Sequence, residues 1–301
     1  MSIKSEITHK IIRLLGCSSI PVWASRYSSL AVPFIPLNHQ FRSDDKVRIR
    51  RDGVLFEVNR SDYMQWHIWA DLVEDNWRHC LRFHRKGSTI IDVGANIGAY
   101  SLKVARHLKL QNDENAKVVA VEANPEIARI LKIQIDLNSD LRPLIDVWDL
   151  ALGDYNGSVS FVASKSNTGG GKISISDSHN AINVPIHRLD DLIFERNLQN
   201  IGILKIDVEG FEPEVLAGAQ ALIHRDRPVL YLEVTDPWIR SRGHSPFELL
   251  IGLKRKFGYE CYLDGGKTIS PIEITEPNLD KIFSREKQIN VLCLSGKELN
   301  S

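Results

Sequence analysis

Residues 90–101 read I-I-D-V-G-A-N-I-G-A-Y-S, and this stretch decides the fold. An apolar, β-branched run leads into Asp92, glycines follow at Gly94 and Gly98, and a helical pattern begins directly behind them. Glycine adopts positive φ without a Cβ clash and allows a ligand to lie against bare backbone. The stretch predicts a strand, a tight turn and a helix N-terminus, which is how open α/β sheets build a nucleotide crevice.

The spacing of the glycines indicates which nucleotide binds there. Dinucleotide enzymes use G-x-G-x-x-G to hold a pyrophosphate, whereas this chain has G-x-x-x-G. Asp92 would repel a pyrophosphate but suits the ammonium and sulfonium charges of S-adenosylmethionine. We therefore expect Asp92, Gly94, Asn96 and Gly98 to bind S-adenosylmethionine, with Asn96 tolerating a left-handed backbone. A nicotinamide-dependent oxidoreductase would need the third glycine and a neutral residue in place of Asp92.

A second strand is predicted at residues 118–121 and ends in Glu122. An acidic side chain at this place accepts hydrogen bonds from ribose hydroxyls, so we expect Glu122 to hold the sugar of the cofactor. Both cofactor classes use this device. Glu122 therefore indicates a nucleoside without distinguishing between them.

Four blocks of the sequence, in the order that they have in the family, resemble the FkbM-type S-adenosylmethionine-dependent methyltransferases. The resemblance covers residues 47–234, and its most specific part is L-K-I-D-V-E-G. The blocks are D-V-G-A-N-I-G (92–98), V-E-A-N-P (121–125), A-L-G-D with G-S-V-S-F (151–154 and 157–161) and L-K-I-D-V-E-G-F-E (204–212).

The resemblance implies methyl transfer to a hydroxyl of a sugar, a glycan or a secondary metabolite. It also implies an adenine contact at the end of the third strand, predicted at residues 144–152, where Ala151 and Asp149 are the candidates. Capping a turn is an alternative role for Asp149. A catalytically idle protein that binds the nucleoside cofactor, or a scaffold, is the alternative function.

The catalytic candidates follow the fourth predicted strand, residues 201–206. The transferred methyl group should lie at the carboxyl end of this strand, at the topological switch point, so Asp207 and Glu209 are the leading candidates for the base. His187 is a further candidate if the hairpin that carries it folds back, although a structural hydrogen bond is the alternative. If a divalent metal is used, Asp207, Glu209 and Glu233 offer the hard oxygen ligands that magnesium prefers.

The remaining pattern predicts an α/β protein, and the resemblance implies that it has a Rossmann-like class I methyltransferase fold. We expect a seven-stranded, mostly parallel sheet with helices on both faces and an antiparallel final strand. Residues 1–85 are expected to form an N-terminal extension and cap, and residues 86–301 the cofactor-binding domain. Further strands are predicted at residues 159–162, 182–186, 229–232, 260–263 and 289–294, and helices at 125–137 and 246–257.

Within the extension, the pattern predicts a helix at residues 3–15, which could contact a second subunit of a homodimer. Asp52-Gly53 is a strong turn signal and predicts a β-hairpin over residues 46–58. One helix is predicted around residues 64–83. Its tryptophans fit either a buried face or a platform for a carbohydrate: Trp66, Trp69 and Trp77. The glycine-rich residues 164–171 read either as a loop over the site or as a plain hairpin tip.

The charge balance and the cysteine content restrict the classes of binding partner and the cellular compartment that we expect. The 301 residues carry 38 Lys and Arg against 38 Asp and Glu, so no overall field attracts nucleic acid. The four cysteines lie far apart and form no C-x-x-C pair, which favours reduced thiols in the cytoplasm. No stretch reaches the length of a transmembrane helix. We expect a cytoplasmic enzyme with a small-molecule or glycan acceptor.

Overall fold

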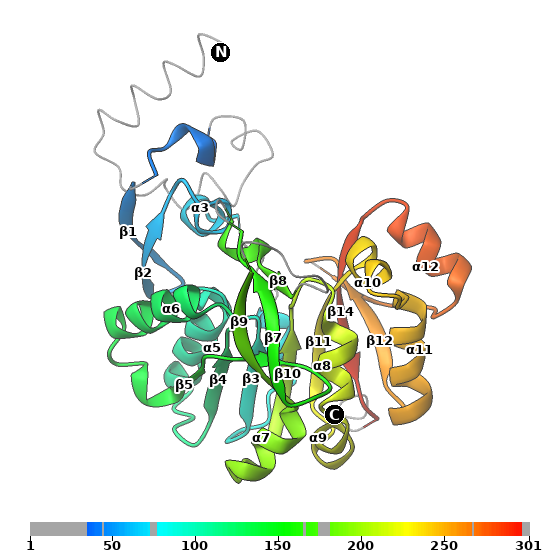
Figure 1. Cartoon of the computed structure of the whole chain (residues 1–301). Helices are drawn as coiled ribbons and strands as arrows, with labels where there is room; N and C mark the ends of the chain where they lie inside the picture. Colours follow the sequence, from blue (N-terminus) through cyan, green and yellow to red (C-terminus); the bar gives the residue numbers. More distant parts are fainter. Residues whose placement is uncertain are drawn as a thin grey trace.

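The computed structural model describes residues 35–43, 45–72, 77–164, 167–173, 181–266 and 268–296. It shows an α/β domain built on one large twisted sheet, with a cap at one end of that sheet (Figure 1). The helix predicted at residues 3–15 lies outside the described residues. None of the helices within the described ranges is long and apolar enough to cross a membrane.

The large sheet has eight strands in the order β13-β12-β14-β11-β10-β3-β4-β5. Strands β11, β10, β3, β4 and β5 run parallel, whereas β14 is antiparallel to both of its neighbours. The order confirms the predicted class I fold and its antiparallel final strand. The eighth strand, β13, is a three-residue edge strand that the sequence did not predict. The bounds are β3 (Thr89–Val93), β4 (Lys117–Val121), β5 (Ile145–Trp148), β10 (Ile201–Ile206), β11 (Val229–Thr235), β12 (Glu260–Asp264), β13 (Ile269–Pro271) and β14 (Gln288–Leu294).

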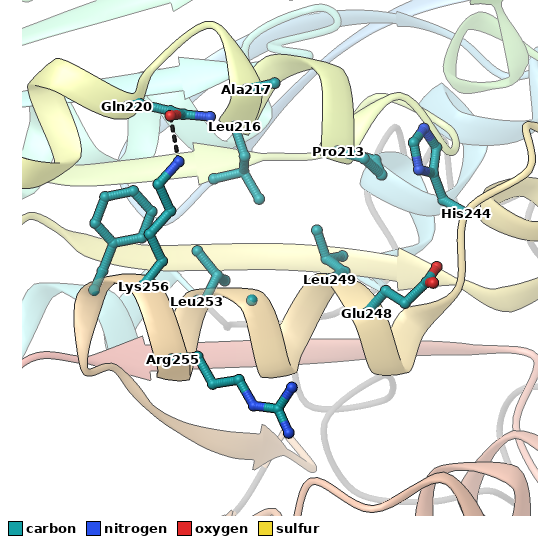
Figure 2. Close-up of a pocket in the computed structure, with 12 residues that line it drawn as sticks. Pro213, Leu216, Ala217, Gln220, His244, Glu248, Leu249, Leu253, Arg255 and Lys256 are labelled. Carbon is teal, nitrogen blue, oxygen red and sulfur yellow. Dashed lines mark hydrogen bonds between the residues drawn. The ribbon is translucent and has the colours of Figure 1, made fainter.

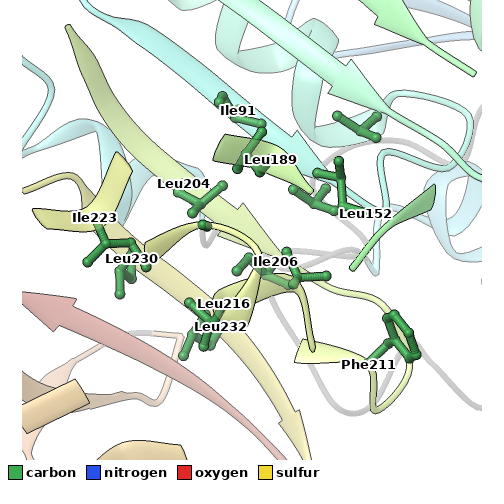
Figure 3. Close-up of a cluster of buried hydrophobic side chains, with 14 of the residues drawn as sticks. Ile91, Leu152, Leu189, Leu204, Ile206, Phe211, Leu216, Ile223, Leu230 and Leu232 are labelled. Atoms are coloured by element: carbon green, nitrogen blue, oxygen red, sulfur yellow. The ribbon is translucent and has the colours of Figure 1, made fainter. Parts of the chain in front are cut away.

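Both faces of this sheet are buried, because alternate residues of each strand enter different apolar cores. Ile91 and Leu204 belong to the core shown in Figure 3, whereas their neighbours Ile90 and Ile203 belong to the opposite core. Helices α7–α12 cover the first face, and α4–α6 cover the second, whereas α3 packs against the hairpin strand β2. The bounds are α3 (Tyr63–Ala70), α4 (Trp77–Leu81), α5 (Ala99–Leu110), α6 (Pro125–Leu137), α7 (Leu189–Glu195), α8 (Glu212–Ala217), α9 (Gln220–Asp226), α10 (Asp236–Ser241), α11 (Pro246–Phe257) and α12 (Glu276–Phe283).

A second, four-stranded sheet packs on the first face, in the order β6-β9-β7-β8. Its strands are β6 (Ala151–Leu152), β7 (Gly157–Val162), β8 (Lys172–Ile173) and β9 (Ala181–His187). The single strand predicted at residues 144–152 was therefore wrong. It is two strands, because the chain turns after Trp148, whose carbonyl accepts hydrogen bonds from the backbone N–H of both Glu122 and Leu150. The turn sends β6 into the second sheet.

The hairpin predicted at Asp52-Gly53 is confirmed by β1 (Lys46–Arg51) and β2 (Val54–Asn59), with positive φ at both turn residues. The single helix predicted over residues 64–83 was wrong, because α3 ends at Asp71, which adopts a left-handed conformation, and α4 begins at Trp77. The three tryptophans of these helices are buried in the core, as the packing interpretation predicted: Trp66, Trp69 and Trp77.

Candidate functional site

A cleft of about 740 Å³ lies at the carboxyl ends of the parallel strands. A cavity of this size accommodates a nucleoside cofactor together with an acceptor. Most of the predicted site residues line it: Gly94, Asn96, Glu122, Ala151, Asp207, Glu209 and Glu233. The other four do not line it: Asp92, Gly98, Asp149 and His187.

The glycine turn between β3 and α5 brings two strand ends into backbone contact. Gly94 has φ +80°, and a Cβ atom built on it would lie 1.8 Å from the carbonyl oxygen of Asp207, at the end of β10. Gly98 also has positive φ, but a Cβ there would lie 2.4 Å from Cδ1 of Leu131 on α6. Gly94 is therefore needed at the cleft, whereas Gly98 is needed for helix packing.

The N–H groups of this turn are already paired with protein acceptors. The N–H groups of Gly94 and Ala95 both donate to the Val121 carbonyl, at 3.0 Å each, and the Asn96 N–H donates to Oε2 of Glu122 at 2.8 Å. A pyrophosphate needs such donors, because helix N-termini and glycine loops bind it through free N–H groups. The turn thus lacks the donors of a dinucleotide site, in agreement with the missing third glycine.

Glu122 follows β4 and lines the cleft as predicted. Each of its carboxylate oxygens accepts one backbone hydrogen bond, from Asn96 to Oε2 and from Asn124 to Oε1 at 2.9 Å. A carboxylate has about four lone-pair positions, so each oxygen retains the capacity to accept from a ribose hydroxyl. Burial raises the pKa of Glu122 to about 7, although the two backbone hydrogen bonds oppose this shift.

Asp92 lies beneath the cleft and forms a buried ion pair. Its side chain is fully buried, and its Oδ1 lies 3.0 Å from the Nζ of Lys205 on β10. Its Oδ2 accepts a hydrogen bond of 2.6 Å from the Ser101 hydroxyl. The Asp92 charge was predicted to lie against the cofactor, but Lys205 provides the cation that balances it. The direct contact between Asp92 and the cofactor therefore stays a prediction that the geometry does not support.

Lys205 was the main charged residue that the sequence analysis left without a role. Its Nζ contacts Asp92 and also Oδ2 of Asp207, at 3.1 Å. Burial lowers the pKa of the Lys205 ammonium, but Asp207 and Asp92 more than compensate, so this pKa lies above the usual lysine value. The strand pairing of Lys205 with Asp92 would have revealed the contact only if the order of the strands were known.

The two residues predicted to contact adenine lie in different surroundings. Ala151, on β6, is buried and lines the cleft between Leu150 and Leu152. Asp149 is exposed, and its carboxylate pairs with the Lys132 ammonium on α6. The apolar wall around Ala151 suits a flat aromatic base, whereas Asp149 is in place to fix the turn before β6.

Three carboxylates gather at the other end of the cleft. Asp207 and Glu209 follow β10, and Glu233 lies on the adjacent strand β11. Burial raises the pKa of Glu233 well above the usual glutamate value, and nearby Asp207 and Glu209 raise it further. Across the described part of the chain, no group of three His, Cys, Asp or Glu side chains is arranged to hold a metal ion, and the magnesium site considered above stays a prediction.

His187 ends β9 in the second sheet, where its carbonyl accepts a hydrogen bond of 3.0 Å from the Gly153 N–H. The hairpin does fold back toward the cleft, but through other residues. Its loop places Asn167, Thr168, Gly169 and Gly171 in the cleft lining. His187 thus does not line the cleft, whereas the glycine-rich loop does.

The same loop is attached to the cap. Asp62, the N-cap residue of α3, accepts from the N–H of Gln65 at 2.9 Å. It also accepts from the N–H and the hydroxyl of Thr168, at 2.7 Å and 2.9 Å. Residues Tyr63, Met64 and His67 of α3 line the cleft beside the loop. No short sequence signal links Asp62 to Thr168, which is 106 residues away.

A smaller pocket of about 440 Å³ lies between α8, α9 and α11 and shares no lining residue with the cleft (Figure 2). Leu216, Leu249 and Leu253 form its apolar floor, and a hydrogen bond from Lys256 to Gln220 spans one end. Its walls are helix side chains. The strand ends with their carboxylates are confined to the larger cleft.

The chain is similar to known methyltransferases. The profile of the methyltransferase FkbM domain matches residues 92–261. The 2-O-methyltransferase NoeI of Sinorhizobium fredii is 24% identical over 184 residues, which are 56% of this chain and 71% of NoeI. The AMB antimetabolite synthetase AmbE of Pseudomonas aeruginosa is 25% identical over 247 residues, which are 67% of this chain but only 11% of AmbE.

The structure also aligns with a solved methyltransferase. The crystal structure of methyltransferase FkbM from Methylobacillus flagellatus aligns with a TM-score of 0.44 and 15% sequence identity. The alignment covers 70% of this chain and 44% of that chain.

Proposed function

Because the chain belongs to the FkbM methyltransferase family, we propose that it is an S-adenosylmethionine-dependent O-methyltransferase that acts on a hydroxyl of a sugar, a glycan or a secondary metabolite. The observation that carries this proposal is that the glycine turn, Glu122 and three carboxylates line one cleft. The relative NoeI is a 2-O-methyltransferase, which supports oxygen as the acceptor atom.

The residues of the cleft suit S-adenosylmethionine. Gly94 leaves bare backbone where a Cβ would collide, Glu122 can accept from ribose hydroxyls, and the wall around Ala151 is apolar. When bound, this cofactor supplies a methyl group activated by a sulfonium. The excess of carboxylates near the strand ends favours a ligand that carries positive charge.

The acceptor would then lie against the ends of β10 and β11. Methyl transfer needs the acceptor oxygen aligned with the carbon–sulfur bond and its proton removed as the new bond forms. Among Asp207, Glu209 and Glu233, at least one side chain is expected to take that proton. We assign the cap, with α3 and its tie to Thr168, to positioning the acceptor.

Calorimetric titration with S-adenosylmethionine tests the cofactor, with NAD as the parallel ligand. We expect binding of S-adenosylmethionine alone. The Glu122→Gln variant should weaken it by about 1.5 to 3 kcal/mol, because the amide is uncharged and has one acceptor oxygen in place of two. Mono- and oligosaccharides and hydroxylated metabolites are then screened with methyl-labelled cofactor. Binding without any methylation across such a panel would favour the cofactor-binding scaffold instead.

A further inference from the structure

We propose that Glu233 is the general base that takes the proton from the acceptor hydroxyl, and that Asp207, held by Lys205, is the residue that positions it. This assignment rests on the proposed methyltransferase function. It selects one carboxylate from the three that line the acceptor end of the cleft.

The strand register places the two side chains together. Strands β10 and β11 are parallel with Ile206 beside Leu232, so Asp207 lies beside Glu233 at the carboxyl ends. Beyond the effect of burial, the Asp207 carboxylate is close enough to raise the pKa of Glu233. The side-chain amide of Gln288, on β14, donates to Oε1 of Glu233 from the other side. Gln288 thus holds Glu233 from the β14 side, and Asp207 lies beside it at the end of β10.

The Lys205 ammonium distinguishes the Asp207 carboxylate from that of Glu233. The Lys205 ammonium lies 3.1 Å from Oδ2 of Asp207, and no described ion pair joins it to Glu233. A carboxylate that is paired with an ammonium is a weak proton acceptor, because taking the proton would break the ion pair. Glu233 has the opposite surroundings, since burial and the charges of Asp207 and Glu209 make its carboxylate a stronger base.

The charged groups that line this cleft with Glu233 include residues of β10, of the segment after it and of the segment before β14. Asp207 and Lys205 belong to β10 and its end, Glu209 follows β10, and Glu286 precedes β14. Three of these four are carboxylates, so the acceptor end of the cleft repels a further negative charge and favours protonated Glu233 when no cation is bound. A sulfonium that enters the cleft reverses this preference and favours the Glu233 carboxylate.

The proposed methyl transfer is a simple displacement at the methyl carbon. The acceptor oxygen forms a bond to the methyl carbon, and the carbon–sulfur bond breaks with its electron pair passing to sulfur. The hydroxyl proton passes to the Glu233 carboxylate. The products are a methyl ether, a neutral thioether and protonated Glu233, which returns its proton to solvent after release.

The first test needs no acceptor. Calorimetry in buffers with different ionisation enthalpies counts the protons released when S-adenosylmethionine binds, with its neutral thioether product as the comparison ligand. We expect the sulfonium ligand to release more protons than the thioether, and Glu233→Gln to remove the difference. Glu195→Gln, an exposed carboxylate on α7, is the control and should release the same number of protons as the wild type. An unchanged difference in Glu233→Gln would overturn the assignment.

The second test uses the acceptor found in the methylation screen. Glu233→Gln should lower kcat by about 10²- to 10⁴-fold with intact cofactor binding. Asp207→Asn should move the acid limb of the kcat profile to lower pH, since it removes the largest charge that raises the pKa of Glu233. Wild-type protein that binds no cofactor would refute the proposed function itself. Active wild type with an equally active Glu233→Gln would refute only the assignment of the base.

Discussion

Replacing Lys205 with methionine should destabilise the fold more than any other single change of charge in the cleft. The variant keeps the length and apolar stem of the side chain but removes the ammonium that lies 3.0 Å from Asp92. Asp92 is 0% exposed, so its carboxylate would be left in the core with only the hydrogen bond from Ser101. Breaking a buried pair in this way costs about 3 to 5 kcal/mol.

The assay is urea unfolding followed by circular dichroism, on wild type, Lys205→Met, Asp92→Asn and the double variant. The double variant should recover most of the loss, because the amide introduced at position 92 is neutral and could still accept from Ser101. Lys109→Met is the matched control. Its ammonium lies 2.9 Å from Asp140, but both side chains are over 40% exposed, so the free energy of unfolding should change little.

Two results would refute this reasoning. One is a loss below about 1 kcal/mol for Lys205→Met, which would mean that water or relaxation already satisfies Asp92. The other is a double variant whose loss equals the sum of the single losses, since a direct ion pair must give a coupling energy in the cycle.

Three further predictions concern the cleft and its cap. Burial raises the pKa of Glu122 to about 7 from 4.5, so the folded state holds this proton more tightly than the unfolded state. As pH rises from about 4.5 to about 7, wild type should therefore lose up to about 3 kcal/mol of stability relative to Glu122→Gln. Unfolding measured at several pH values tests this, and equal pH profiles for the two proteins would contradict it. Asp62→Ala should cost about 1 kcal/mol of stability through loss of the N-cap, and it should speed amide hydrogen exchange at Thr168. Unchanged exchange would show that the bonds from Thr168 to Asp62 do not hold the loop. Phosphorylated acceptors should be methylated at least tenfold less efficiently than their neutral parents at equal concentration. The reason is that Lys205, the single Lys or Arg in the described cleft lining, is already paired with Asp207. Equal kcat/KM for the two kinds of acceptor would count against an acidic acceptor site.

Local patterns predicted the elements whose ends carry their own signals. Helices α6 and α11 begin and end where they were predicted, because Asn124 and Ser245 cap their first turns and a proline follows each cap. The glycine turn and Glu122 also lie where the motif placed them. These features depend on residues close together in the chain, so one sequence contains enough information to find them.

The features that the sequence did not reveal depend on contacts between distant residues. The turn after Trp148 is set by bonds to β4, and it divided a run that read as one strand. The Lys205 pair with Asp92 joins residues 113 positions apart on adjacent strands. Asp149 and His187 were placed near the site by their position along the chain, but an exposed ion pair and the second sheet hold them elsewhere.

The contact between Gly94 and the Asp207 carbonyl has a consequence for how this protein can change. The glycine turn after β3 and the end of β10 meet there without any intervening side chain. A substitution at position 94 must push the β10 end away, so it would alter the recognition of both ligands at once. Acceptor preference can diversify through α3, the loop at Thr168 and α10, which contact the cleft from outside the sheet. Selection for a new acceptor is thus expected to alter the cap and spare this junction.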